Sequence, residues 1–460
     1  MKRSVLGVAF AVCVLAALLV PSVGAARQFA PGAAGAGDPF FPLAGSGGYD
    51  VRHYDLVLDY APATNRLRGD VTVTAAATQD LSSFDLDLRG FTVSAVLVDG
   101  HAATFARRGQ ELIITPGEGI PAGSTFLATV RYAGRPSVVT DPDGSIEGWV
   151  PTADGAFVVG EPQGSPGWYP CNDTPADKAT FDFAVTVPRG ITVMASGDLL
   201  FREASRGKTT WRWREDDPMA TYLATATLGR FDLTRSSVDG VPCYIAVDSG
   251  LRQRAVLKKL PSMVRFFASR FGQYPFDAVG AIVDRAPRVG YALETQTKPV
   301  FDSMPDEATL AHELAHQWFG DSVTLTQWPD IWLHEGFATW CEWIWSGHEG
   351  GRSAATTFRL LYKTPASKAG LWNPPPGDPG TPANLFSAAV YEHGAMTLEA
   401  LREKVGTSAF FTILRTWAQD NQFGNVTTPQ FIALAERTSG MDLDAFFQVW
   451  LYQTGKPRDW

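Results

Sequence analysis

Two histidines and two glutamates carry the clearest chemistry in this sequence of 460 residues. His312 and His316 lie four positions apart inside a segment with helical periodicity. That spacing puts both imidazole rings on one face of a helix, about one turn apart, where they can share a zinc ion. Glu313 points to a different side of the helix and can reach a water molecule at the metal rather than the metal itself. The pattern therefore predicts a metal site with a carboxylate beside it.

Glu335 is the second glutamate, and eighteen residues separate it from His316. It lies in the next helical segment, which could pack antiparallel to the first and bring Glu335 to the metal as a third ligand. The fourth position is then left for water. Two histidines, one carboxylate and one water are typical of catalytic zinc sites rather than structural ones. These motifs predict a hydrolase with one Zn²⁺ per chain, although the ligands would also accept cobalt or manganese.

A third glutamate stands out because of its surroundings. Glu294 lies in the mostly apolar stretch 289–297, and the basic residues closest to it in the sequence are Arg288 and Lys298. Burying a carboxylate is costly unless a charged partner meets it. We therefore expect Glu294 to face a cation that the flanking residues do not supply.

The elements that must position these residues follow from the periodicity. From Tyr49 to about Phe231, short segments alternate between apolar and polar residues and are separated by turn signals, which is typical of antiparallel strands. Beyond that point the apolar residues recur at intervals of three and four, which is typical of helices. We predict an α+β fold, with a mostly antiparallel β domain over 49–236 and a mainly helical catalytic domain over 237–460.

The N-terminal residues predict export from the cell. Two basic residues precede an apolar run over 5–20, which is followed by small residues. This pattern indicates a secretory signal peptide over 1–25, with cleavage after Ala25 or Ala26. The apolar run is short for a membrane span, so we expect a secreted chain without membrane association. Residues 26–48 are rich in Gly, Ala and Pro and predict a linker.

Composition argues against several classes of partner. The net charge is −9 and no run of Lys or Arg marks a surface for nucleic acid. After cleavage, Cys171, Cys243 and Cys341 remain, in a spacing that fits no metal motif. An odd number leaves at least one thiol free, so we expect small buried apolar side chains with at most one disulfide bond. The sequence leaves the oligomeric state open.

Four motifs, taken together, resemble the aminopeptidase N family of zinc metallopeptidases, the gluzincins with an HExxH-x18-E motif, which includes leukotriene hydrolase. HELAHQWFG (312–320) followed by EGFA (335–338) is similar to the family's metal motif. EPQGSPGWYPCNDTPADKATF (161–181), GYALE (290–294) and VYEHGA (390–395) resemble three further family segments, in the expected order. The match runs from about residue 49 to the end of the chain.

This resemblance implies a short secreted member of bacterial type with a thermolysin-like catalytic domain. The C-terminal sandwich and helical domains of longer members are expected to be absent. It also implies roles for named residues. Glu313 would take a proton from the attacking water and deliver it to the leaving amine, and Tyr391 would stabilise the oxyanion. Glu294 and Glu161 would bind the free α-ammonium group of the substrate, which supplies the cation that Glu294 lacks. The expected substrates are peptides with a free N-terminus, cleaved at their first peptide bond.

Several positions depart from the family pattern. Tyr291 and Thr295 flank the ammonium-binding motif where Gly and Asn are usual, and Pro166 and His393 also differ. His334 precedes the expected metal ligand Glu335 at a position that is often Asn or Lys. His334 could offer a fourth contact to the metal, but we expect it instead to lie behind the metal ligands or to face solvent, since adjacent helix positions point apart.

Other functions remain as alternatives. A zinc endopeptidase shares the HExxH motif and the downstream glutamate. The segments around Glu161 and Glu294 argue against it, because an endopeptidase needs no site for an ammonium group. A binding or scaffold protein with a decayed site is a second alternative, although all the catalytic positions are intact. An epoxide hydrolase activity like that of leukotriene hydrolase is compatible with the motifs, but nothing in the sequence calls for it.

Overall fold

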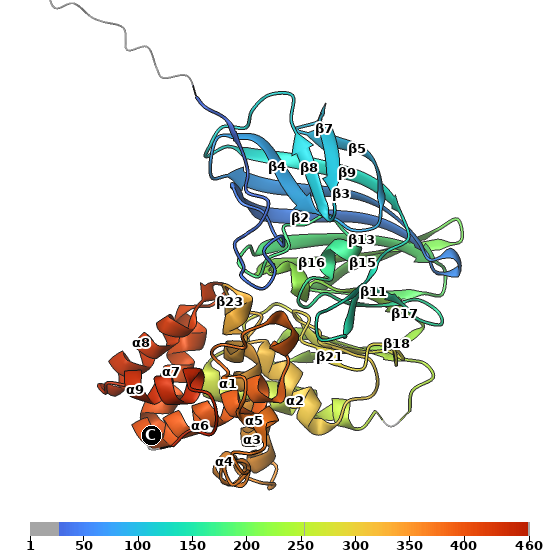
Figure 1. Cartoon of the computed structure of the whole chain (residues 1–460). Coiled ribbons are helices and arrows are strands. Elements are labelled where there is room, and N and C mark those ends of the chain that lie inside the picture. Colours follow the sequence, from blue (N-terminus) through green and yellow to red (C-terminus); the bar gives the residue numbers. More distant parts are fainter. Residues whose placement is uncertain (1–26, 253, 459–460) are drawn as a thin grey trace, which may run out of the picture.

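Strands dominate the N-terminal part of the chain and helices the C-terminal part (Figure 1). The computed structural model describes residues 27–252 and 254–458. The signal peptide expected over 1–25 lies outside these residues. We call residues 27–229 the β domain and residues 231–458 the helical domain. The predicted α+β fold class and the order of the two parts are confirmed.

The strands of the β domain form three sheets. Their bounds are β1 (Ala30–Pro31), β2 (Tyr49–Ala61), β3 (Arg66–Ala77), β4 (Leu81–Asp87), β5 (Thr92–Val98), β6 (His101–Ala102), β7 (Thr104–Arg108), β8 (Glu111–Thr115), β9 (Thr125–Gly134), β10 (Val138–Thr140), β11 (Ile146–Pro151), β12 (Ala156–Val159), β13 (Ala179–Pro188), β14 (Thr192–Ala195), β15 (Asp198–Ser205), β16 (Lys208–Met219) and β17 (Ala226–Gly229). Within the described residues the sheet orders are β1-β4-β8-β7, β10-β11-β12-β17-β14 and β15-β16-β13-β2-β3-β9-β5-β6.

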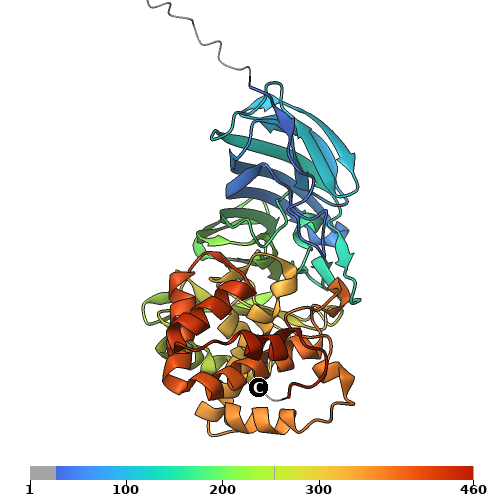
Figure 2. The ribbon, with the colours of Figure 1, turned by 60° about the vertical axis from the view of Figure 1, so that its left-hand side comes forward.

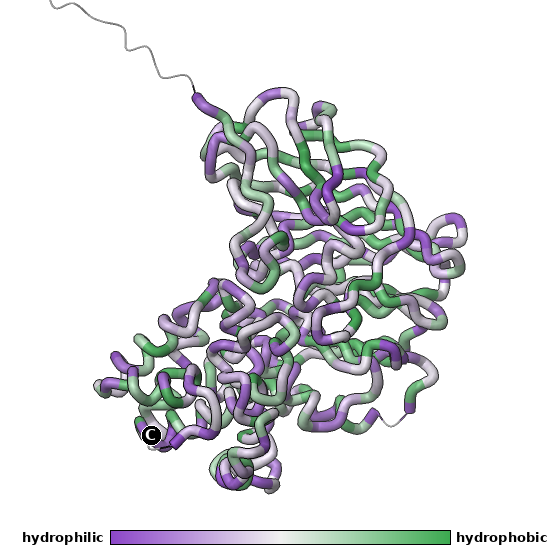
Figure 3. The backbone as a smooth tube through the Cα atoms, viewed as in Figure 1, coloured by the Kyte–Doolittle hydropathy of each residue, from purple (hydrophilic) through white to green (hydrophobic). Residues whose placement is uncertain are grey.

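The alternating pattern that predicted these strands reflects burial of one sheet face. In β2, Tyr54, Leu56, Leu58 and Tyr60 are buried, and the residues between them are exposed or partly exposed. Hydrophobic and hydrophilic residues alternate along the strands of the β domain in Figure 3. Most strand pairs are antiparallel, as predicted, while β13 runs parallel to β2.

Residues 27–48 differ from the linker that their composition suggested. β1 pairs with β4, and the aromatic ring of Phe41 packs against that of Trp328 in the helical domain. The carboxylate of Asp38 accepts a hydrogen bond from the backbone N–H of Trp328 at 2.8 Å. The segment therefore packs along the β domain and reaches the helical domain. Its Gly and Pro residues allow tight turns there rather than free movement.

The helical domain begins with a sheet of order β18-β19-β20-β22-β21. Its strands are β18 (Phe231–Val238), β19 (Val241–Asp248), β20 (Val279–Val283), β21 (Ala292–Leu293) and β22 (Val300–Phe301), with β23 (Thr324–Leu325) and β24 (Asn425–Val426) forming a separate pair. The boundary that we expected at residue 236 falls inside β18. Since β18 pairs with β19, both strands belong to the helical domain.

The α-helices lie together on one side of the β domain, as the turned view in Figure 2 also shows. Their bounds are α1 (Leu260–Phe271), α2 (Glu307–His316), α3 (Trp332–His348), α4 (Ala354–Tyr362), α5 (Ala369–Trp372), α6 (Gly394–Val405), α7 (Thr407–Asp420), α8 (Thr428–Ser439) and α9 (Asp444–Phe447). Within the described ranges we find no helix whose length and hydropathy would let it span a lipid bilayer. Cys171, Cys243 and Cys341 are buried and free, within the expectation of at most one disulfide bond.

The two domains share one hydrophobic core. At their junction the ring of Tyr222 from the β domain meets that of Trp328 from the helical domain, with centroids 5.2 Å apart. Helix α2 begins at an N-cap, because the side chain of Asp306 accepts a hydrogen bond from the backbone N–H of Thr309. From Leu310 onward every residue of α2 is buried, so this helix runs through the core and holds its polar side chains at fixed positions.

Candidate active site

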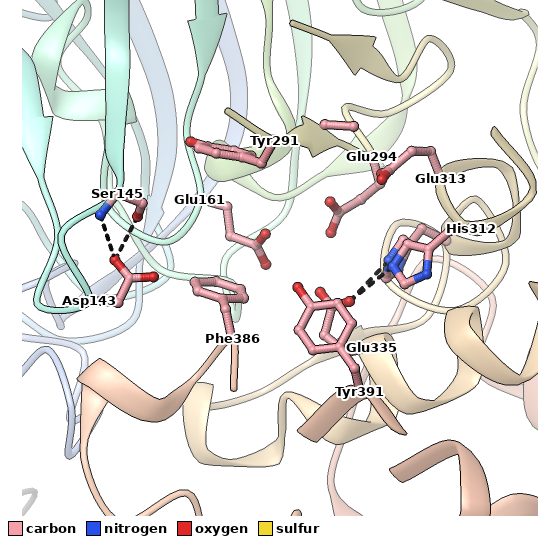
Figure 4. A pocket seen from close by; sticks show the side chains of 12 residues that line it. Asp143, Ser145, Glu161, Tyr291, Glu294, His312, Glu313, Glu335, Phe386 and Tyr391 are labelled. Atoms are coloured by element: carbon pink, nitrogen blue, oxygen red, sulfur yellow. Dashed lines mark hydrogen bonds and ion pairs between the residues drawn. The ribbon is translucent and has the colours of Figure 1, made fainter. Parts of the chain in front are cut away.

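A cavity of about 200 Å³ lies between the two domains and collects all the predicted site residues. The residues that line it are Asp143, Ser145, Glu161, Tyr291, Ala292, Glu294, His312, Glu313, His316, Glu335, Phe386 and Tyr391. The first three belong to the β domain and the others to the helical domain. Figure 4 shows the labelled side chains converging on one space from both sides.

The three predicted metal ligands lie against one another. His312 Nε2 is 3.1 Å and His316 Nε2 is 3.6 Å from Glu335 Oε2. Helices α2 and α3 therefore bring the two histidines and the downstream glutamate together. One ligand atom from each of the three residues lies within 4.8 Å of the other two. This spacing fits a single ion bound by all three.

The outer nitrogens of both histidines are already engaged. His312 Nδ1 lies 2.6 Å from Glu342 Oε1, and His316 Nδ1 lies 3.0 Å from the carbonyl oxygen of Phe319. Each of these oxygens accepts a hydrogen bond from Nδ1, so Nε2 of each ring is the nitrogen directed toward Glu335, and in the neutral ring it is free to bind a metal ion. Histidines that ligate a metal are typically held by such hydrogen bonds. The donor set of two nitrogens and a carboxylate thus fits zinc.

Gly320 permits the contact of His316 with the loop that follows α2. Its φ of +147° is rarely adopted by other residues, and a Cβ atom there would lie 3.0 Å from His316 Nδ1. The chain can therefore turn closely around the imidazole ring and direct the Phe319 carbonyl toward it. The glycine that ends the HELAHQWFG motif thus supports a metal ligand.

Glu342 was not identified from the sequence, and it holds His312. We expect the substitution Glu342→Gln to weaken zinc binding by about 10- to 100-fold, because Nδ1 of His312 loses a charged acceptor. Zinc titration of the metal-free protein by calorimetry measures the change without relying on activity. Glu349→Gln is a matched control, since Glu349 lies at the end of the same helix and pairs with Lys259 at the surface. An unchanged zinc Kd in Glu342→Gln would contradict this role.

Glu313 lies beside the ligand cluster and is buried. Burial raises the pKa of its carboxyl group to about 8, although His312 and His316 act in the opposite direction. A divalent cation at the neighbouring ligands would lower this pKa and favour the carboxylate that a general base requires.

Glu161 and Glu294 approach the cavity from different domains. Both side chains are buried, and Oε1 of each has no hydrogen-bond partner among the described residues. Burial, and then the charge of Glu294, raises the pKa of Glu161 well above its usual value. Burial also raises the pKa of Glu294, while His316 lowers it. The two carboxyl groups therefore form an acidic pair, and among the described residues that line the cavity there is no lysine or arginine to meet it.

Gln317 fixes the position of Glu294 relative to the metal ligands. Its side-chain amide donates to the backbone carbonyl of Glu294 at 3.1 Å and accepts from the backbone N–H of Thr297 at 2.8 Å. Gln317 directly follows His316, so one segment holds both a metal ligand and the loop of the acidic pair. The sequence motif contains this glutamine, but its spacing alone gave no reason to assign it a role.

Tyr391 lies over the metal ligands. Its ring stacks on that of His312, with centroids 5.8 Å apart and an angle of 16° between the planes. It belongs to a π-helical segment, Ala389–His393, which leads into α6. A Cβ atom on Gly336 would lie 2.9 Å from the carbonyl carbon of Gly394, so α3 and the start of α6 cross at two glycines. This close crossing places Tyr391 beside the ligand on α3.

The two unusual histidines differ in their surroundings. His334 is fully buried, and its Nε2 accepts a hydrogen bond from the backbone N–H of Leu325 at 2.9 Å. Burial lowers its pKa to about 3, so the ring is neutral and does not face solvent. One of its ring nitrogens lies within 4.8 Å of carboxyl oxygens of both Glu161 and Glu294, so the ring borders the acidic pair instead of facing solvent. The ring of His393 packs between Trp372 and Trp450.

Comparisons with known proteins agree with this geometry. A model of the peptidase M1 N-terminal domain matches residues 51–223, and a model of the peptidase family M1 domain matches residues 292–450. A probable aminopeptidase of Sulfurisphaera tokodaii is 23% identical over 443 residues, which cover 89% of this chain and 53% of that protein. An aminopeptidase M1 of Arabidopsis thaliana is 26% identical over 327 residues, which cover 65% of this chain and 36% of that protein. The chain therefore spans about half, or less, of the length of these curated relatives.

A solved structure is similar over nearly its whole length. It is a mutant M1 zinc metallopeptidase from Deinococcus radiodurans bound to a Tyr-Ser-Ala substrate. The TM-score is 0.84 at 32% sequence identity, and the match covers 92% of this chain and 99% of that one.

Proposed function

The chain belongs to the M1 family of zinc metallopeptidases, and from this premise we propose that it is an aminopeptidase that hydrolyses the first peptide bond of peptides with a free N-terminus. One observation carries the proposal: three side chains that could hold a metal ion share a cavity with an acidic pair, and the described lining of that cavity has no lysine or arginine. The pair, Glu161 and Glu294, suits an α-ammonium group. The Tyr-Ser-Ala substrate of the Deinococcus radiodurans relative supports a peptide as the ligand.

Each residue then has a defined part in the reaction. His312, His316 and Glu335 would hold a zinc ion, which would supply Lewis acidity to the scissile carbonyl and lower the pKa of water to about 7. Glu313 accepts the proton of the attacking water and passes it to the leaving amine. Tyr391 donates a hydrogen bond to the oxygen on which negative charge develops.

The electrostatics of the cavity support the assignment of Tyr391. Burial, and then the charge of Glu335, raises the pKa of its phenol well above the usual value. The hydroxyl group therefore keeps its proton at neutral pH and can act as a donor. Its ring is held by the stack on His312, so the donor is positioned before substrate binds.

The acidic pair favours an exopeptidase over an endopeptidase. An internal peptide segment has no positive charge to offer, and it would leave both buried carboxyl groups without a partner. A free N-terminus satisfies them and also fixes how far the chain extends past the metal ligands. The bond cleaved is then the one that follows the first residue.

Product analysis tests this function. We expect the wild-type protein to remove residues one at a time from the N-terminus of a short peptide, as followed by mass spectrometry. A chelator should abolish the reaction and added zinc should restore it. Fragments from internal cleavage would indicate an endopeptidase, and cleavage that persists in chelator would exclude the zinc-dependent reaction.

We also propose that the protein is exported. The support is the N-terminal pattern of two basic residues and an apolar run over 5–20. N-terminal sequencing of the protein recovered from the medium of an expressing host would test this, with Ala26 or Arg27 expected as the first residue.

A further inference from the structure

We propose that the end of the cavity away from the metal ligands selects substrates with a basic first residue, arginine or lysine, through the carboxylate of Asp143. This inference rests on the proposed aminopeptidase function, because it concerns the side chain of the residue whose ammonium group binds Glu161 and Glu294. It adds a substrate class that the motifs did not specify.

The cavity has two chemically different ends (Figure 4). The metal ligands and Glu313 lie at one end, and Asp143 and Ser145 lie at the other. Glu161 lies between them. A substrate whose ammonium group is held at Glu161 therefore has its scissile bond toward the metal ligands. The space toward Asp143 remains for its first side chain.

Two aromatic side chains flank the path to Asp143. Figure 4 shows Tyr291 and Phe386 on opposite sides of the space next to Glu161. Aromatic rings accept the aliphatic stem of a long side chain and attract a guanidinium or ammonium group at their faces. Tyr291 stands where the family pattern has glycine, so the aromatic ring on this side of the cavity is specific to this chain and is not part of the family motif.

Tyr291 also holds the loop that carries Asp143. Its hydroxyl group donates a hydrogen bond to the backbone carbonyl of Ile146 at 3.0 Å. Asp143 lies in the turn between β10 and β11, and Ile146 is the first residue of β11. The helical domain thus fixes the position of a turn that belongs to the β domain.

Asp143 has its charge available for a ligand. Its Oδ1 accepts hydrogen bonds from the backbone N–H of Ser145 at 2.9 Å and from the Ser145 hydroxyl group at 2.7 Å, which orient the carboxylate. Within the described ranges Asp143 forms no ion pair. Oδ2 is left for a bond to a cationic side chain.

The cavity is acidic in composition as well. The residues that line it include five Asp and Glu side chains and, among the described residues, no lysine or arginine. Burial, and then the acidic groups of Glu147, Asp141, Glu161 and Asp143 in that order, raise the pKa of the Tyr291 phenol well above its usual value. An acidic cavity favours the binding of a positively charged first residue and disfavours that of an acidic one.

The test compares arginine with citrulline, which has the same shape without the charge. Each is offered as the aminomethylcoumarin amide to the zinc-loaded protein at low ionic strength. Asp143 is exposed, so we expect the wild type to prefer arginine by about three- to fivefold in kcat/KM, the upper part of the range for an exposed ion pair. In Asp143→Asn the ratio should fall to within about twofold of one. Because both substrates are measured on one sample, a change in the folded fraction cancels.

Two controls accompany the ratio. Asp99→Asn changes the same chemical group in another exposed turn of the β domain, where Asp99 also accepts a backbone hydrogen bond, and it should keep the wild-type preference. Raising the salt concentration to about 1 M should reduce the wild-type preference for arginine, because the Debye length, over which charges act on one another, falls to about 3 Å.

The outcomes separate this inference from the function on which it rests. Equal cleavage of arginine and citrulline amides by the wild type, or an unchanged ratio in Asp143→Asn, would overturn the role of Asp143 and leave the aminopeptidase intact. If the zinc-loaded wild type cleaves no free aminoacyl amide, including those of leucine and alanine, both proposals fail.

Discussion

Replacing Glu313 with glutamine is expected to lower kcat by about 10²- to 10⁴-fold, the usual contribution of a general base. Glutamine keeps the size of the side chain but cannot accept the proton of the attacking water. Since Glu313 is not one of the three ligands, zinc binding should be retained. Steady-state kinetics on a free peptide, with metal content measured on the same sample, tests both statements.

The control for this variant is a glutamate far from the chemistry. Glu403→Gln lies on the exposed side of α6 and should keep wild-type activity and stability. If Glu313→Gln retained more than about a tenth of the wild-type kcat with zinc bound, another group would have to be the base. Loss of zinc from the variant would instead show that Glu313 contributes to the metal site.

Replacing Glu294 with glutamine is expected to lower kcat/KM by a similar factor, because it weakens binding of the substrate's ammonium group and not the proton transfer. Removing one partner of a buried charge pair costs about 2–5 kcal/mol. That range corresponds to roughly a 30-fold to several-thousandfold decrease in kcat/KM for peptides with a free N-terminus. The decrease should concern kcat/KM for free peptides, while zinc affinity stays the same.

Glu161 provides a second measurement of the same effect. Glu161→Gln should also decrease kcat/KM, and the double variant should lose less than the sum of the two single free-energy changes, since both act on one ammonium group. Additive losses would mean that the two carboxylates do not share a ligand. If Glu294→Gln kept the wild-type kcat/KM, the acidic pair would not determine the specificity for a free N-terminus.

The two histidines of the candidate metal site could be singled out from the sequence because their spacing is local. A separation of four residues defines one face of a helix, whatever the tertiary structure, and His312 and His316 follow this rule. Glu342 follows it too, since it lies seven residues after Glu335 on the same helix. The interval of seven residues places Glu342 on the same face of the helix as Glu335, close enough to contact a metal-site histidine. Without the fold, however, Glu342 could not be distinguished from an exposed glutamate.

Contacts between distant segments could not be predicted in this way. Glu161 reaches the site only because the β domain packs on the helical domain, and its assignment depended on the family resemblance. The crossing at Gly336 and Gly394 joins two motifs that the sequence shows as separate. The position of Asp143 in the cavity depends on the same domain packing, so neither composition nor periodicity could indicate a role in specificity.

The packing of residues 27–48 shows a limit of compositional reasoning. Gly, Ala and Pro favour a linker when nothing else binds the segment. Here Phe41 and the backbone of β1 find partners on other elements, and these contacts outweigh the intrinsic freedom of the chain. In contrast, the fold class was predictable, because each alternating segment had to bury one face.

The most direct test of the account is paired hydrolysis of one tetrapeptide, free and N-acetylated, by the zinc-loaded protein. Acetylation removes the positive charge that Glu161 and Glu294 are proposed to bind and leaves the peptide bonds of the substrate unchanged. We predict release of the first residue from the free peptide and no cleavage of the acetylated one. Cleavage of both forms at comparable rates would contradict the central claim that a free N-terminus is required.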